Sequence, residues 1–190
     1  MSFQVNSPTT FGIGGSLNWL VGGAVGGAIG SLLFGVLLWL VDPTIISEGI
    51  PAIYGLEPAG TAGWLFHLGH GLVLGSIFGL LVTRRPIFGT LMADVETGFI
   101  DAMGPGLRLT LAGFVYGLAV WAVLPVIVLP IWMSLGIGDA GFPAFAFGTL
   151  VGHLLYGLLL GALFALIVEI AAEAEAVDAP FEEAGDSPRE

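Results

Sequence analysis

The sequence predicts an all-α membrane protein: a bundle of four transmembrane helices built from two tandem, parallel helical hairpins, with both termini in the cytoplasm. Three observations support this prediction, namely the composition of the chain, four long apolar stretches, and a single basic connection between them. Of the 190 residues, 56% are hydrophobic and only 10% are charged, whereas a soluble domain carries roughly a quarter charged residues. So few charges cannot cover a surface exposed to water, so most of the surface is expected to face lipid.

A membrane-spanning helix needs about 20 mostly apolar residues, and four stretches meet this requirement. They are Ser16–Val41, Thr61–Thr83, Leu107–Leu135 and Ala144–Ile170. The first eighteen residues contain neither lysine nor arginine, so we expect the first stretch to remain a membrane helix rather than act as a cleaved signal. Within the third stretch, Pro125 and Pro130 are expected to kink the helix. Tryptophans near the ends of the stretches, Trp19, Trp39, Trp64 and Trp132, should anchor them at the membrane interface.

The charges of the connecting loops predict the orientation of the chain. Arg84, Arg85 and Arg108 flank the connection between the second and third stretches, whereas the other two loops carry acidic residues and no basic ones. Positively charged residues favour the cytoplasmic side of a membrane. This connection, and with four spans also both termini, should therefore lie in the cytoplasm.

The chain accordingly divides into five parts. These are an N-terminal cytoplasmic segment (1–15), a first transmembrane hairpin (16–83), a cytoplasmic amphipathic connection (84–106), a second transmembrane hairpin (107–170) and an acidic, disordered tail (171–190). Apolar residues recur at helical spacing in the connection, which predicts a helix lying on the inner membrane surface. They are Phe88, Leu91, Val95, Phe99 and Met103. A similar short element is expected at Pro43–Tyr54, and a helical extension of the fourth stretch from Glu169.

Part of the sequence is repeated. An offset of 86 residues, from His67 to His153, aligns the second stretch with the fourth and makes nine of sixteen positions identical. The first and third stretches agree less well, at an offset of 82 residues that aligns Trp39 with Trp121. A repeated two-helix unit keeps its orientation, so the two hairpins should be parallel and related by a pseudo-twofold axis along the membrane normal.

Small residues recur at every fourth position in three of the stretches. They are Gly22, Gly26 and Gly30 in the first, Gly71, Gly75 and Gly79 in the second, and Gly157, Gly161 and Ala165 in the fourth. Lipid gives apolar side chains little reason to associate, so membrane helices pack through small residues that let their backbones approach. Each such row of small residues forms a ridge along one face of its helix. These ridges therefore predict helix–helix contacts, either within the bundle or with another subunit.

The three histidines, His67, His70 and His153, all lie in the outer halves of the second and fourth stretches. Ionisable residues in a membrane span are rare enough to suggest a functional site. Since His67 and His153 occupy the same position in the repeat, they should face one another or the bundle centre. There they could ligate the iron of a b-type haem, His67 and His70 could begin a metal site, or the histidines could relay protons or ions. The favoured interpretation is a hydrogen bond that holds two helices together.

Two stretches resemble an uncharacterised family of small four-helix membrane proteins of haloarchaea. They read AIYGLEPAGTAGWLFHLGHGLVLGSIFGLL and GHLLYGLLLGALFAL, and the resemblance extends over about Trp19 to Val168. The net charge of −11 and the absence of lysine agree with a protein kept hydrated in concentrated salt. The resemblance implies four spans, a saline habitat and a role for the histidines that is general to the family. It implies no particular activity.

The sequence carries no nucleophile–base–acid set, phosphate-binding loop or pair of intramembrane carboxylates. We expect a multi-pass protein of the cell membrane that is not an enzyme, needs no cofactor and binds no nucleic acid, because a basic surface is missing. Its partners would be the lipid bilayer and other membrane subunits or a second copy, and its role that of an accessory or scaffold subunit of a membrane complex. The alternatives are an electron-transfer subunit with haem b on His67 and His153, and a small channel or carrier.

Overall fold

The computed structural model describes residues 17–92, 103–136 and 147–178, and this part of the chain contains four helices that are long and apolar enough to cross a membrane. They are α1 (Asn18–Val41), α3 (Gly60–Val82), a third span over Pro105–Leu135, and the apolar part of α8, Gly148–Glu169. The shortest has 22 residues and is therefore about 33 Å long, enough for a hydrocarbon core about 30 Å thick. The prediction of four membrane-length helices is confirmed.

The third span is interrupted by a π-helical turn. α6 (Pro105–Val123) leads into η3 (Leu124–Val128), and α7 (Leu129–Gly136) completes the span. The turn includes Pro125 in its first residues. Proline has no backbone N–H, so it cannot donate the backbone hydrogen bond that a regular α-helix needs at this position. The wider turn therefore lies where the sequence predicts that proline disturbs the helix.

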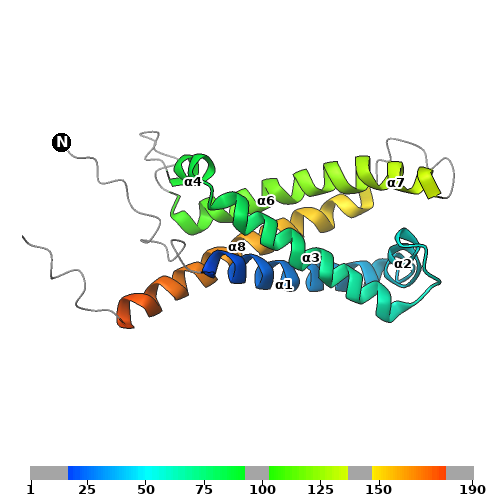
Figure 1. Ribbon diagram of the computed structural model, residues 1–190, viewed down its shortest axis with the longest axis horizontal. Coiled ribbons are helices and arrows are strands. Elements are labelled where there is room, and N and C mark those ends of the chain that lie inside the picture. Colours follow the sequence, from blue (N-terminus) through cyan, green and yellow to red (C-terminus); the bar gives the residue numbers. More distant parts are fainter. Residues whose placement is uncertain (1–16, 93–102, 137–146, 179–190) are drawn as a thin grey trace, which may run out of the picture.

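α1 lies at the centre of the arrangement. It packs along α3 on one face and along α8 on another, and α8 packs in turn along α6. α3 and α6 touch over a short stretch only, so the helix pairs in extensive contact are α3 with α1, α1 with α8, and α8 with α6. The start of α1, the end of α8 and the short helix α4 (Arg85–Met92) lie at one end of the bundle (Figure 1).

At the opposite end, the segment between α1 and α3 folds back against α3. Asp42 follows α1, and its carboxylate accepts hydrogen bonds from the hydroxyl and the N–H of Thr44, at 2.6 and 3.0 Å. These bonds hold the pKa of Asp42 below its usual value. η2 (Ile45–Gly49) and α2 (Ile50–Ile53) come next, so Pro43–Tyr54 is largely helical. Ile46 is fully buried where η2 meets α3.

The described parts of the predicted amphipathic connection are residues 84–92, which include α4, and residues 103–106, where α6 begins. Phe88 and Leu91 pack against the core of the bundle, whereas Val95 and Phe99 lie outside the described residues. The guanidinium of Arg108 donates hydrogen bonds to the carbonyl oxygens of Met103, at 2.9 Å, and Leu91, at 3.0 Å. Because Arg108 belongs to α6, its bond to Leu91 ties α4 to the start of the third span.

The fourth span continues beyond the apolar region. α8 extends to Asp178, so residues 171–178 of the segment predicted as a disordered tail are helical. The helical extension expected from Glu169 is present over this range. The predicted N-terminal segment, 1–15, and the tail from 179 onwards lie outside the described residues.

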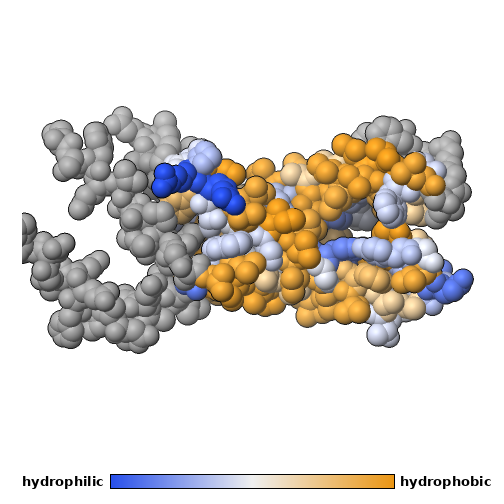
Figure 2. All heavy atoms as spheres, in the orientation of Figure 1, coloured by the Kyte–Doolittle hydropathy of each residue, from blue (hydrophilic) through white to orange (hydrophobic). Residues whose placement is uncertain are grey.

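The large apolar side chains divide between a core and an exposed outer surface. The core cluster consists of Phe34, Leu38, Ile46, Ile50, Phe78, Val82, Leu109, Tyr156, Leu160, Phe164 and Val168. Many others are exposed, for example Leu65 at 70% and Val115 at 63%. Apolar surface runs along the spans, and the strongly hydrophilic residues gather near the two ends (Figure 2). Such a surface suits a helical bundle surrounded by lipid rather than by water.

Candidate functional site

α1 and α3 meet through glycines. Gly23 lies against Gly75 and Gly27 against Gly71, so the two helices run antiparallel. A Cβ at any of these four positions would lie closer than 3.0 Å to a backbone carbonyl oxygen of the other helix. A backbone oxygen cannot rotate away as the end of a side chain can, so this contact requires glycine at all four positions.

A second glycine ridge of α1 faces α8. In order along α1, Gly22, Gly26 and Gly30 face Phe164, Leu160 and Tyr156 of α8. These three large side chains are almost fully buried. The ridge predicted from the four-residue spacing thus accepts large side chains of α8, while the ridge one residue further on makes the backbone contact with α3.

α6 and α8 also meet through glycines. Gly113 of α6 lies against Gly157, and Gly117 lies against the backbone of His153. Gly161 of α8 lies against the backbone of Leu109 and Thr110. All seven glycines predicted to pack helices, Gly22, Gly26, Gly30, Gly71, Gly75, Gly157 and Gly161, therefore lie in contacts within the bundle. Gly23, Gly27, Gly113 and Gly117 join them without having been predicted.

Tyr116 occupies the short contact between α3 and α6. Its ring packs against Phe78 with 5.3 Å between the ring centroids, and its hydroxyl donates to the carbonyl oxygen of Leu74 at 2.8 Å. A side chain of this size keeps α3 and α6 apart. Tyr156 of α8 makes a related bond, because its hydroxyl donates to the carbonyl oxygen of Gly71 at 2.9 Å.

His67 and His153 lie on either side of Phe34 in the interior of the bundle. The Phe34 ring stands edge-on to both imidazoles, with centroid distances of 5.4 Å to His67 and 5.0 Å to His153. The Nε2–H of His67 donates to the carbonyl oxygen of Ser31 in α1 at 2.8 Å, and the Nδ1–H of His153 donates to that of Thr149 in α8 at 2.8 Å. Phe34 can enter this position because Gly152 leaves it room. Both histidines thus face the interior, and both pack against the same aromatic ring.

This arrangement does not fit a haem held between His67 and His153. The macrocycle would need the space that the ring of Phe34 fills, and axial ligation by Nε2 of His67 would break its bond to Ser31. A metal site begun by His67 and His70 also lacks further ligands, since the described residues contain no group of three His, Cys, Asp or Glu side chains able to hold a metal ion. The hydrogen bond of His67 to α1 is the helix-joining role that we favoured from the sequence.

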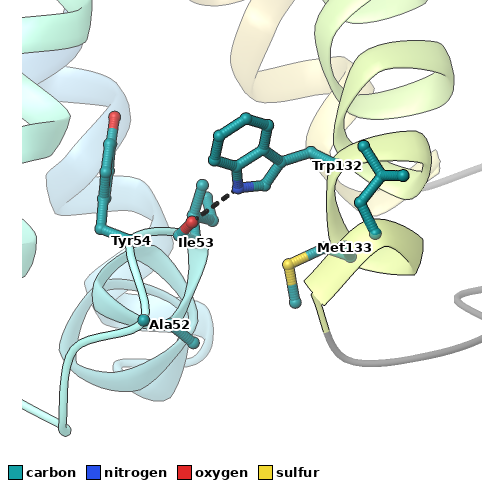
Figure 3. Close-up of a pocket in the computed structure, with 7 residues that line it drawn as sticks. Ala52, Ile53, Tyr54, Trp132 and Met133 are labelled. Carbon is teal, nitrogen blue, oxygen red and sulfur yellow. Dashed lines mark hydrogen bonds between the residues drawn. The ribbon is translucent and has the colours of Figure 1, made fainter.

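His70 belongs to a different environment, at the edge of an open groove. Its Nε2 pairs with the hydroxyl of Tyr54, whose ring stacks on Phe66 with 4.3 Å between centroids. The groove has a volume of about 490 Å³ and is lined by Ala52, Ile53, Tyr54, Gly55, Trp132, Met133 and Leu135. The indole N–H of Trp132, on α7, donates to the carbonyl oxygen of Ile53 at 2.8 Å and joins the two walls (Figure 3).

This groove was not predicted from the sequence. Trp132 was expected only to anchor the third span at the interface, and Tyr54 only to end a short outer element. The groove depends on how η2 and α2 fold back, and a single tyrosine at the end of a loop carries no signal of such a contact.

The arginines used to predict the orientation lie at the end of the bundle that holds α4. Arg84 follows α3 and Arg85 begins α4, and both are exposed. Arg108 is partly buried and bonds to the backbone carbonyls described above. Among the described residues, the positive charge exposed at this end therefore comes chiefly from Arg84 and Arg85.

Over the residues that the structure describes, the fold is all-helical with four membrane-length helices, and interior imidazole and phenol groups bond to backbone carbonyls. Comparison with protein-family models, with curated proteins and with solved structures finds no match for this chain. The resemblance to small membrane proteins of haloarchaea therefore stays a prediction.

Proposed function

We propose that this protein is a non-enzymatic, multi-pass accessory or scaffold subunit of the cell membrane, which presents a rigid helical bundle to partner membrane proteins. One observation carries the proposal: the polar side chains of the interior are engaged by the backbone of the bundle itself. The bonds run from His67 to Ser31, His153 to Thr149, Tyr116 to Leu74 and Tyr156 to Gly71. A catalytic or transport site needs convergent polar groups that meet a substrate. Here the bonds of His67, Tyr116 and Tyr156 join two helices, whereas that of His153 stays within α8.

The outer faces of the spans supply the area that a partner would contact. Large apolar side chains are exposed on each helix, including Leu33 on α1, Leu65 on α3, Val115 on α6 and Val151 on α8. Membrane helices associate by packing such faces closely against each other. The partner is another membrane subunit or a second copy of the chain, and lipid covers the remaining surface.

Extraction in a mild detergent tests this role. The purified assembly is expected to have a protein mass above the 19.6 kDa of a single chain. Tryptophan is then introduced at one exposed position per helix, as Leu33→Trp, Leu65→Trp, Val115→Trp and Val151→Trp. The substitution in the contact face should lower recovery of the partner about tenfold, the effect of losing roughly 1.4 kcal/mol. The other three variants are the matched controls, and a monomer that retains no partner contradicts the proposal.

We further infer that the end of the bundle with α4, the start of α1 and the end of α8 faces the cytoplasm, so that both termini are cytoplasmic. Support comes from the exposed pair Arg84 and Arg85 at this end and from the acidic residues Glu48 and Glu57 at the other. Positive charge is retained on the cytoplasmic side of a membrane.

Cysteine labelling tests the orientation, because the chain contains no cysteine of its own. A membrane-impermeant maleimide should label Glu57→Cys in intact cells and should label Thr90→Cys only after the membrane is permeabilised. Both positions are exposed, so the two variants control for each other's reactivity. The reverse pattern would place the arginines outside the cell and refute the orientation.

We also infer that the α1–α3 and α6–α8 pairs are two tandem copies of one hairpin, arranged in parallel. The contact of Gly27 with Gly71 recurs as the contact of Gly113 with Gly157, and both partners move by 86 positions. The offset of 82 that the sequence suggests for the first and third stretches would instead place Leu109 at the position of Gly27. The contacts therefore favour an offset of 86 residues for the whole hairpin. Tyr116 then corresponds to Gly30, which accounts for the loose contact between α3 and α6.

A further inference from the structure

The groove between α2 and α7 opens at the outer end of the spans. In Figure 2 the surface is hollowed between α7 and the segment around α2. The seven residues that line the groove are uncharged and mostly apolar, and its volume of about 490 Å³ lies within the range of small-molecule sites, about 300–1,000 Å³. Because the surrounding surface of the spans is apolar, the medium that reaches this groove from the side is lipid.

The two sides of the bundle differ in how this region is filled. Between α1 and α8, the ring of Phe34 enters the space left by Gly152. With the proposed offset of 86 residues, the corresponding positions between α6 and α3 are Val120 and Phe66. The side chain of Val120 is smaller than that of Phe34. Phe66 of α3 is instead covered by the ring of Tyr54, which stacks on it and remains 45% exposed. Where α1 presents a phenylalanine to α8, the corresponding position of α6 therefore carries the smaller valine.

Polar groups at the groove define what could bind there. Tyr54 lines the groove, and its hydroxyl pairs with Nε2 of His70. A phenol paired with an imidazole can give or accept one further hydrogen bond, depending on which of the two holds the shared proton. Glu48 and Glu57 are exposed on the same outer segment, and their charge repels an anionic head group.

We propose that the groove between α2 and α7 binds the hydrocarbon chain of an uncharged membrane amphiphile, whose hydroxyl or carbonyl group hydrogen-bonds to the pair formed by Tyr54 and His70. The chain of the ligand lies against Trp132 and Met133 on one wall and against Ala52 and Ile53 on the other (Figure 3). This site is distinct from the proposed contact faces of a partner subunit, because it lies between α2 and the third span of a single chain.

Photolabelling of the full-length protein in vesicles tests the site. The probe is a monoacylglycerol that carries a diazirine in its chain, and a fatty acid with the same chain is the charged counterpart. The monoacylglycerol should label residues 52–55 and 132–135, and an excess of unlabelled monoacylglycerol should compete it away. The fatty acid should label these residues about tenfold less.

Variants separate the groove from the general lipid surface. Ala52→Trp and Met133→Trp fill the groove from opposite walls and should each abolish the competed labelling, whereas Leu111→Trp on the exposed face of α6 should leave it unchanged. Tyr54→Phe keeps the ring but removes the hydroxyl, and should weaken competition about threefold to tenfold, as expected for one hydrogen bond in a membrane. Circular dichroism checks that each variant keeps its helical content. Uniform labelling of all lipid-facing residues, or equal labelling by the fatty acid, overturns the proposal and leaves the proposed scaffold role unaffected.

Discussion

Replacing Phe34 by alanine is expected to destabilise the folded bundle by about 3–5 kcal/mol, the usual cost of removing a fully packed phenylalanine. The side chain is 5% exposed, stands edge-on to both His67 and His153, and fills the space left by Gly152. Its removal leaves a cavity at the point where α1, α3 and α8 meet. Reversible unfolding in mixed micelles, followed by circular dichroism, measures the loss.

Phe114→Ala is the matched control for this substitution. Phe114 lies on α6 and is 38% exposed, so much of its ring contacts lipid rather than protein. Losing it should therefore change the free energy of unfolding far less than losing Phe34. Equal effects of the two substitutions would mean that Phe34 does not pack as described.

A double-mutant cycle tests the same contact more directly. Gly152→Ala alone should destabilise by about 1–3 kcal/mol or more, since overpacking forces neighbours to move and a Cβ there would lie closer than 3.0 Å to the Phe34 ring. In the Phe34→Ala background the same substitution should lower the free energy of unfolding only slightly, because the ring is gone and the methyl group of the new alanine enters the cavity. The two effects should therefore be strongly non-additive, as expected for residues in contact. Additive effects would refute the contact.

The second large effect is expected at the glycine contacts between helices. Gly75→Ala and Gly157→Ala should each lower the free energy of unfolding by about 1–3 kcal/mol or more, because a Cβ at either position would meet a backbone carbonyl oxygen. At roughly 2–4 °C per kcal/mol for a chain of this size, the midpoint temperature of thermal unfolding would fall by about 2–12 °C. Gly75 packs α3 against α1 and Gly157 packs α8 against α6, so the two variants test one contact in each helix pair.

Gly69→Ala is the control in the same helix as Gly75. Nothing lies within 4 Å of a Cβ built at Gly69, and alanine favours a helix over glycine by up to about 1 kcal/mol. This variant should be as stable as the parent or slightly more stable. If it loses as much stability as Gly75→Ala, the effect comes from glycine itself and not from the contact between α1 and α3.

The helices of this protein could be predicted because the apolar stretches are long and carry few charges. The glycine ridges could be predicted only in part. The four-residue spacing of Gly22, Gly26 and Gly30 predicts one contact face, but Gly23 and Gly27 form a separate face that this spacing does not indicate. Successive residues of an α-helix point about 100° apart, so adjacent glycines serve two different partners. That is why α1 can pack against both α3 and α8.

The surroundings of the histidines could not be predicted to the same extent. The repeat placed His67 and His153 towards the interior, and both lie there. The contact of Phe34 with both histidines depends on how closely α1 approaches α8. Gly152 permits this approach because it has no side chain. The pair of Tyr54 and His70 depends on the fold of η2 and α2, and sequence periodicity carries no information on a π-helical turn.

The contact between α1 and α8 has a consequence for biogenesis. A ribosome delivers the N-terminal helix first and the last span only at the end of synthesis. While α3 can join α1 early, the face with Gly22, Gly26 and Gly30 has no partner in the chain until α8 is inserted. Completion of the bundle is therefore the final step of insertion, and until then the nascent protein exposes to the bilayer a small-residue surface of the kind through which membrane helices associate.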